Sequence, residues 1–125
     1  MVDVEVENRS GREVEGEAAA EFARTVLAAE GVDEGELAIH FVGPEEIRAL
    51  KRDHLGIDEA TDVLAFPIDE RDEVPGELPR LLGDAVICPQ VVADEWRAPL
   101  VHALLHLLGH DHGPEMEARE RIHQQ

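Results

Sequence analysis

The sequence has one cysteine, few basic residues and no long apolar run, and each shortage excludes a class of protein. Cys88 has no partner for an internal disulfide, so a disulfide-stapled secreted scaffold is excluded and a reducing cytoplasm is expected. No stretch reaches the roughly 18 to 20 apolar residues that a membrane span needs. The acidic N-terminus lacks the basic and apolar segments of a secretory signal. These shortages predict a cytoplasmic protein with no membrane partner.

Basic residues are also scarce, since 11 Lys and Arg stand against 29 Asp and Glu, which gives a formal net charge of −18. The simplest interpretation is a solvated acidic surface, of halophilic or GC-rich origin. A dedicated duplex-DNA binder is not expected, because DNA phosphates require a basic footprint. A nucleic-acid enzyme is compatible with this charge only if its few basic residues are concentrated in one place.

The length of 125 residues and the apolar content of 43% predict one domain, residues 1–125, with a single two-layer core. Alternating and helical apolar patterns predict strands over residues 2–7, 36–42, 61–67 and 83–89, and helices over 14–30, from 44 onward, and over 100–108. Residues 68–82 are interpreted as a surface loop. A last amphipathic segment, 115–123, is expected to use Met116 and Ile122 as apolar contacts.

Four of the seven histidines lie within residues 102–112, in the segment HALLHLLGHDH. His102 and His106 are four residues apart, so on a helix they project to the same side. Gly109 allows a sharp turn that brings His112 back toward them, whereas His110 is expected to point elsewhere. Three imidazoles on a divalent cation leave a fourth position for water, which is typical of a catalytic metal site. We therefore predict a metal site at His102, His106 and His112.

The same spacing occurs in metzincin peptidases, whose helix carries the motif H-E-x-x-H. Ala103 stands here in place of the glutamate. Without that carboxylate the site has no general base of the peptidase kind, so a peptidase is disfavoured.

Three motifs resemble the YbeY endoribonuclease family. TDVLAFP at 61–67 is similar to the family's TDVLSFP, LLGDAVICPQV at 81–91 to its LLGDIVIC-type strand, and HALLHLLGHDH to its histidine motif. The resemblance implies a small α+β fold, with a mixed sheet of about four strands packed with helices and a zinc site on a C-terminal helix-turn. It also implies a zinc-dependent, single-strand-specific endoribonuclease with one Zn²⁺ per chain. The implied partners are single-stranded rRNA and the small ribosomal subunit, in rRNA maturation and ribosome quality control.

The chain departs from the family pattern at several positions. Leu55 stands where the family usually carries an arginine, and Ala103 and Ala65 replace a glycine and a serine. The segment between Asp84 and His102 is shorter than the family pattern by about one helix. Zinc binding is expected to survive these differences, whereas RNA turnover depends on them.

Arg48, Lys51 and Arg52 share one face of the second predicted helix and form the densest group of bases in the chain. They are interpreted either as a solvated helix face that pairs with Glu45 or as an RNA contact that replaces the missing arginine. Asp62 and Asp84 are interpreted as capping or turn residues, and Cys88 as a small buried hydrophobe.

Two functions of different class therefore remain open, an endoribonuclease and a catalytically weak, zinc-stabilised ribosome assembly factor. In the first, a metal-activated water or a ribose 2′-OH attacks phosphorus, and the sequence does not identify the catalytic residues.

Overall fold

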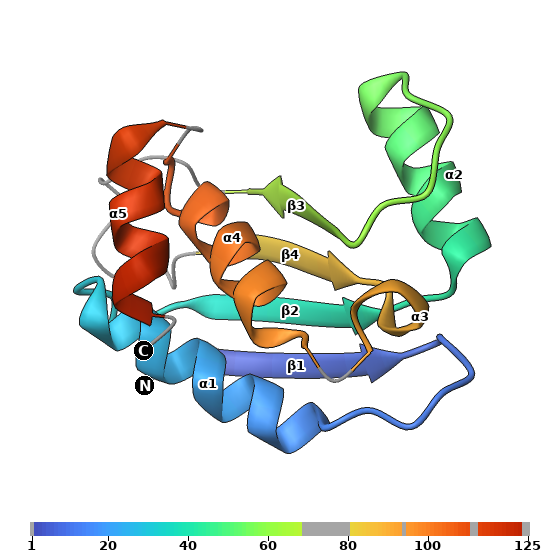
Figure 1. Cartoon of the computed structure of the whole chain (residues 1–125). Coiled ribbons are helices and arrows are strands. Elements are labelled where there is room, and N and C mark those ends of the chain that lie inside the picture. Colours follow the sequence, from blue (N-terminus) through green and yellow to red (C-terminus); the bar gives the residue numbers. More distant parts are fainter. Residues whose placement is uncertain (1, 69–80, 94, 111–112, 124–125) are drawn as a thin grey trace.

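The chain folds around one mixed β-sheet in the computed structural model, which describes residues 2–68, 81–93, 95–110 and 113–123. The strand order is β1-β2-β4-β3 (Figure 1). The first three of these strands are parallel, and β3 pairs with β4 in the antiparallel sense. The four strands are β1 Asp3–Asn8, β2 Glu36–Phe41, β3 Val63–Pro67 and β4 Leu81–Ile87. The α+β class and the mixed four-stranded sheet are thus confirmed.

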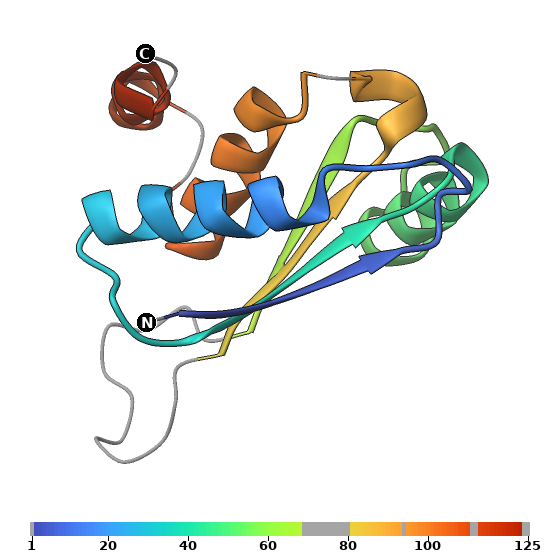
Figure 2. The same cartoon turned by 90° about the horizontal axis from the view of Figure 1, so that it is seen from below.

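The helices of the described residues lie on both sides of this sheet (Figure 2). They are α1 Gly16–Ala29, α2 Pro44–Leu55, α3 Pro89–Val92, α4 Arg97–Leu107 and α5 Pro114–His123. Helices α1 and α4 pack on one face, where the main apolar core lies. Helix α2 packs on the other face through Ile47, which joins Leu64, Val86 and Cys88 in a smaller cluster. No helix in the described ranges is both long and apolar enough to cross a bilayer.

The apolar pattern explains which face of each element is buried. Leu37, Ile39 and Phe41 alternate along β2 and are fully or almost fully buried beneath α1 and α4. Helix α4 is buried along Leu100, Val101, Leu104, Leu105 and Leu107. Each such side chain contributes about 1.5–3 kcal/mol of transfer free energy, so α4 is held firmly against the sheet.

Gly83 allows β3 and β4 to approach closely. Its φ is +133°, and a Cβ at this position would collide with the carbonyl oxygen of Phe66 on β3. Only glycine meets both conditions without strain.

Several sequence-based boundaries were wrong. The predicted loop 68–82 extends too far, because Leu81 and Leu82 already belong to β4, and residues 69–80 lie outside the described ranges. Helix α4 begins at Arg97, so Pro99 lies in its first turn, where no intrahelical N–H bond is lost. Helix α3 was not predicted. Ile122 is 57% exposed rather than packed in the core, whereas Met116 is buried as expected.

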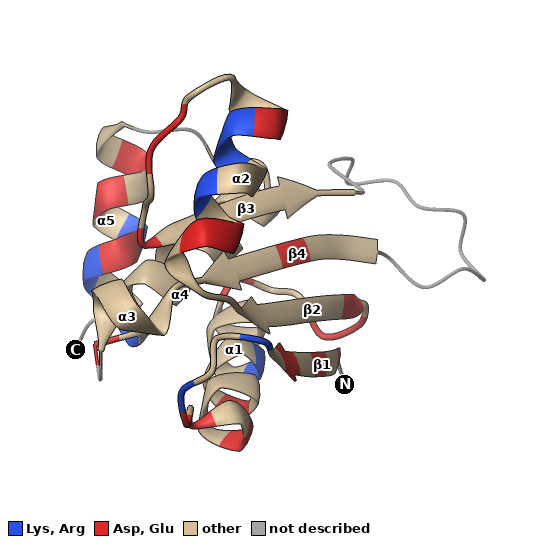
Figure 3. Ribbon diagram, turned by 90° about the vertical axis from the view of Figure 1, so that its right-hand side faces the viewer, with Lys and Arg blue, Asp and Glu red and all other residues tan. Residues whose placement is uncertain are grey.

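The distribution of charged residues over the fold reflects the acidic composition of the chain. Acidic positions are spread over α1, β1 and α5, while α2 carries a group of bases (Figure 3). This group consists of Arg48, Lys51 and Arg52, as the sequence indicated.

Candidate metal centre in a histidine pocket

Helix α4 brings His102 and His106 together. Their ring centroids lie 4.7 Å apart, with the ring planes at 79°. The opposite side of the helix is buried through Val101, Leu104 and Leu105, which fixes the rotation of α4 about its axis. The prediction that these two histidines share one side of a helix is confirmed.

Two residues after α4 ends, Gly109 forms a left-handed turn. The φ of Gly109 is +94°, and its N–H donates to the carbonyl of His106 at 3.0 Å. The N–H of His110 donates to the carbonyl of Leu105, also at 3.0 Å. These two hydrogen bonds are the Schellman pattern, in which a glycine reverses the chain over the helix end. The predicted turn at Gly109 is therefore present.

His110, the residue after this turn, is among the residues that line a pocket together with His102 and His106. Its Nε2 lies 4.0 Å from Glu30 Oε1. His112, the predicted third ligand, lies outside the described residues.

The histidines line a pocket of about 630 Å³ between α4 and the edge strand β3. Its lining comprises Leu55, Val63, Leu64, Ala65, Pro67, His102, Ala103, His106, Gly109 and His110. Among these described lining residues there is no carboxylate, and Ala103 is itself buried. The part of the lining that the structure describes thus lacks the acidic general base that a peptidase of this helix type uses.

The described donor set fits part of a zinc site. Zinc takes neutral imidazole nitrogens, and His102 and His106 place two of them on one pocket wall. Within the described ranges no group of three or more metal-binding side chains is assembled. One ring nitrogen of His102, Nδ1, lies 3.4 Å from Glu120 Oε1 on α5, a contact that sequence spacing did not indicate.

Each base of the α2 group pairs with a carboxylate. Arg48 Nε lies 2.7 Å from Asp58 Oδ1, Lys51 Nζ 3.0 Å from Glu59 Oε1, and Arg52 Nε 3.2 Å from Asp53 Oδ1. The hydrogen bond from Arg48 lowers the pKa of the Asp58 carboxyl below its ordinary value of 3.8. The partners Asp58 and Glu59 come from the segment after α2, whereas helical spacing suggested Glu45.

Asp84 is neither a cap nor a turn residue, so that prediction was wrong. It lies inside β4, and its Oδ1 is 2.8 Å from Nε2 of His40 on β2. The register pairs Phe66 with Asp84 but Ala65 with Ala85, so Asp84 faces away from the histidine pocket. Asp62 precedes β3, and its carbonyl accepts the N–H of Cys88 at 2.9 Å. Cys88 is fully buried, as expected.

Comparison with known proteins identifies the family. The family described as "Endoribonuclease YbeY" matches residues 4–125. The chain belongs to the YbeY family. Similar YbeY relatives, each named "Endoribonuclease YbeY", come from Halorhodospira halophila, Salinispora tropica and Cellvibrio japonicus.

The three YbeY relatives align over most of this chain. The H. halophila protein is 43% identical over 103 residues, which cover 70% of this chain and 67% of the relative. The S. tropica protein is 39% identical over 139 residues, which cover 95% of this chain and 88% of the relative. The C. japonicus protein is 37% identical over 138 residues, which cover 100% of this chain and 76% of the relative. The last two alignments are longer than this chain of 125 residues, so both relatives carry residues that it lacks.

A solved structure supports the fold. The solution structure of TM1509 from Thermotoga maritima matches with a TM-score of 0.59 at 24% identity, covering 96% of this chain and 85% of that one.

Proposed function

We propose that this YbeY-family chain is a cytoplasmic, zinc-dependent, single-strand-specific endoribonuclease that acts in small-subunit rRNA maturation and ribosome quality control. Its membership of a family whose relatives are named endoribonuclease supports the reaction class. The observation that carries the proposal is the adjacent pair His102 and His106 on the wall of an open pocket.

In this proposal His102, His106 and His112 hold one zinc ion per chain. Zinc, when bound, supplies Lewis-acid stabilisation of charge on a phosphodiester and lowers the pKa of water. The chain's own contribution is orientation, because the buried side of α4 holds the imidazoles of His102 and His106 toward the pocket.

The pocket also suits a single strand. A volume of about 630 Å³ lies in the range of small-molecule sites, which is the scale of one nucleotide. Leu55, Val63 and Pro67 offer apolar surface for a base or sugar, while the histidines face the phosphodiester. A duplex would present many phosphates to a chain of net charge −18, with little to neutralise them.

The proposal is tested with purified protein that is loaded with zinc or treated with a chelator. The loaded chain is expected to hold one equivalent of zinc and to cleave a short unstructured RNA, but not the same sequence in a duplex. His102→Ala and His106→Ala should lose most of the metal and the activity, while the control His54→Ala, on α2, should keep both. A 2′,3′-cyclic phosphate on the product would identify the 2′-OH as nucleophile. Retention of a full equivalent of zinc by His106→Ala would contradict the site.

A second candidate is a catalytically weak, zinc-stabilised ribosome assembly factor. It is favoured by Leu55, because an apolar side chain lines the pocket where the family usually places a guanidinium. Arg48, Lys51 and Arg52, the proposed RNA contact, are each paired with a carboxylate, which weakens their attraction for phosphate. Zinc binding without turnover of any single-stranded RNA would favour this candidate.

A further inference from the structure

Glu120 approaches the metal-site histidine His102 from a separate helix. Its Oε1 lies 3.4 Å from His102 Nδ1, across the contact between α4 and α5. Both side chains are largely removed from solvent, with 28% of His102 and 23% of Glu120 exposed. A carboxylate and an imidazole held this close become hydrogen-bonded after a small rotation of either side chain.

His102 lines two hollows. One is the histidine pocket, which it shares with His106 and His110. The other has a volume of about 360 Å³, and His102 lines it together with Glu120, Asp62 and Pro99. The two nitrogens of an imidazole point in different directions, and Nδ1 is the one near Glu120. In the proposed site, Nε2 is then the nitrogen that binds the metal.

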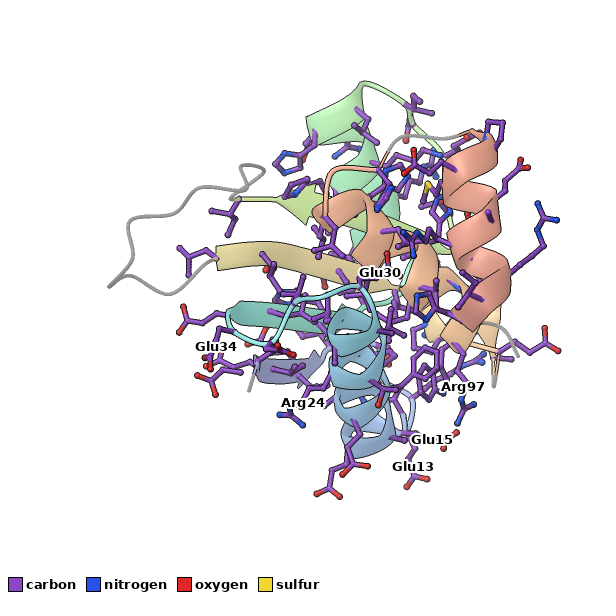
Figure 4. All side chains as sticks on the ribbon, turned by 90° about the vertical axis from the view of Figure 1, so that its left-hand side faces the viewer. Glu13, Glu15, Arg24, Glu30, Glu34 and Arg97 are labelled. Atoms are coloured by element: carbon purple, nitrogen blue, oxygen red, sulfur yellow. The ribbon has the colours of Figure 1, made fainter. Side chains whose placement is uncertain are left out.

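The inward position of Glu120 is built into α5. Met116 is four residues earlier and is buried, and His123 is three residues later. Residues three or four apart lie on the same side of a helix, so these three face the body of the protein together. His123 Nε2 contacts Glu30 Oε2 at 2.9 Å, and Glu30 at the end of α1 points toward the helices α4 and α5 (Figure 4). Contacts on both sides of Glu120 thus hold it toward His102.

We infer that Glu120 is a positioning residue for the metal site, orienting His102 by accepting its Nδ1–H. This inference rests on the proposed zinc site. A carboxylate on the second nitrogen of a metal-binding histidine fixes the tautomer and the ring orientation, and raises the basicity of the ligand. Loss of such a partner typically lowers metal affinity about 10- to 100-fold.

The test compares zinc dissociation constants, measured by competition with a chromophoric chelator, for the wild type and its variants. Glu120→Ala should bind zinc about 10- to 100-fold more weakly than the wild type, and Glu120→Gln, which keeps an acceptor oxygen, should lose less. Glu117→Ala, at an exposed position on the same helix, is the matched control and should bind as the wild type does. The visible spectrum of the cobalt-loaded protein should change in Glu120→Ala, because it reports ligand geometry.

A double-mutant cycle separates positioning from a general effect on folding. Adding Glu120→Ala to His102→Ala should leave the remaining zinc affinity unchanged, because the imidazole that Glu120 orients is already absent. Adding Glu120→Ala to His106→Ala should lower the zinc affinity further. An equal effect in both backgrounds, or a wild-type affinity for Glu120→Ala, would overturn the inference while leaving the zinc site intact. Failure of the wild type to bind zinc would instead overturn the proposed function on which the inference rests.

Discussion

Glu30 and His123 are 93 residues apart in the sequence and join the end of α1 to the end of α5. Glu30 Oε2 lies 2.9 Å from His123 Nε2, and each side chain is only 6% exposed. Two further groups lie near the Glu30 carboxylate. Arg119 Nη1 is 3.7 Å from Glu30 Oε2, and His110 Nε2 is 4.0 Å from Glu30 Oε1. A carboxylate at a helix C-terminus is unfavourable by itself, so these three groups offset its interaction with the helix dipole.

Glu30→Ala should therefore destabilise the protein by about 2 kcal/mol or more, because it leaves His123 buried without its acceptor. The loss would be measured by urea denaturation. Glu21→Ala, on an exposed part of α1, is the control and should change stability by less than about 0.5 kcal/mol. Equal stability of the two variants would contradict the structural importance of this pair.

Replacing Gly109 or Gly83 with alanine should separate two costs in folding stability, namely backbone strain and steric collision. Gly109 has positive φ, and no heavy atom lies within 4 Å of where a Cβ would stand, so Gly109→Ala should cost about 1–2 kcal/mol from strain alone. Gly83→Ala adds a collision with the Phe66 carbonyl and should cost about 3 kcal/mol or more. Thermal or urea unfolding measures both values. The reverse order would mean that β3 can move away from β4 at little cost.

Leu55→Arg should raise RNA affinity or cleavage. Leu55 is 57% exposed and lines the histidine pocket, so an arginine there would place a guanidinium beside the proposed phosphate position. Val91→Arg, at a similarly exposed apolar position on α3, adds the same charge outside the residues that line this pocket. RNA binding titrations should distinguish the two variants. An equal gain in both would mean that only net charge had changed.

The α2 group should influence RNA binding through charge. Replacing Arg48, Lys51 and Arg52 together with glutamine should weaken binding and reduce its dependence on salt, if these bases release their carboxylates to contact phosphate. The measurement is the binding constant as a function of salt concentration. An unchanged salt slope would make this group ordinary helix surface.

The pKa of the Asp58 carboxyl should show whether Asp58 is paired with Arg48 of α2 in solution. Its carboxyl has a pKa below 3.8 because of the Arg48 hydrogen bond, so the pairing favours the folded state above that pH. The contribution is lost as the pH falls through the lowered pKa. Arg48→Gln should return the pKa of Asp58 toward 3.8, whereas Lys51→Gln should change it less, as NMR titration of the side-chain carboxyl would show. Equal shifts in the two variants would contradict a specific Arg48 contact.

The sequence alone determined the local features of this protein. The four-residue spacing of His102 and His106 placed both rings on one side of α4, and Gly109 predicted the turn that ends the helix. Strand and helix patterns were also readable, because they depend on hydrogen bonds and side-chain directions within a few residues.

Tertiary structure decided what surrounds those histidines. The pocket wall is β3, which reaches α4 only because β4 lies between β2 and β3 in the sheet. Glu120 approaches His102 because α5 docks through Met116, and the Gly109 turn brings His110 to the lining of the pocket. The order of strands and the docking of helices depend on burial of apolar surface among residues far apart in the chain. No local spacing contains that information, so the sequence predicted that His102 and His106 share one side of a helix but not which residues surround them.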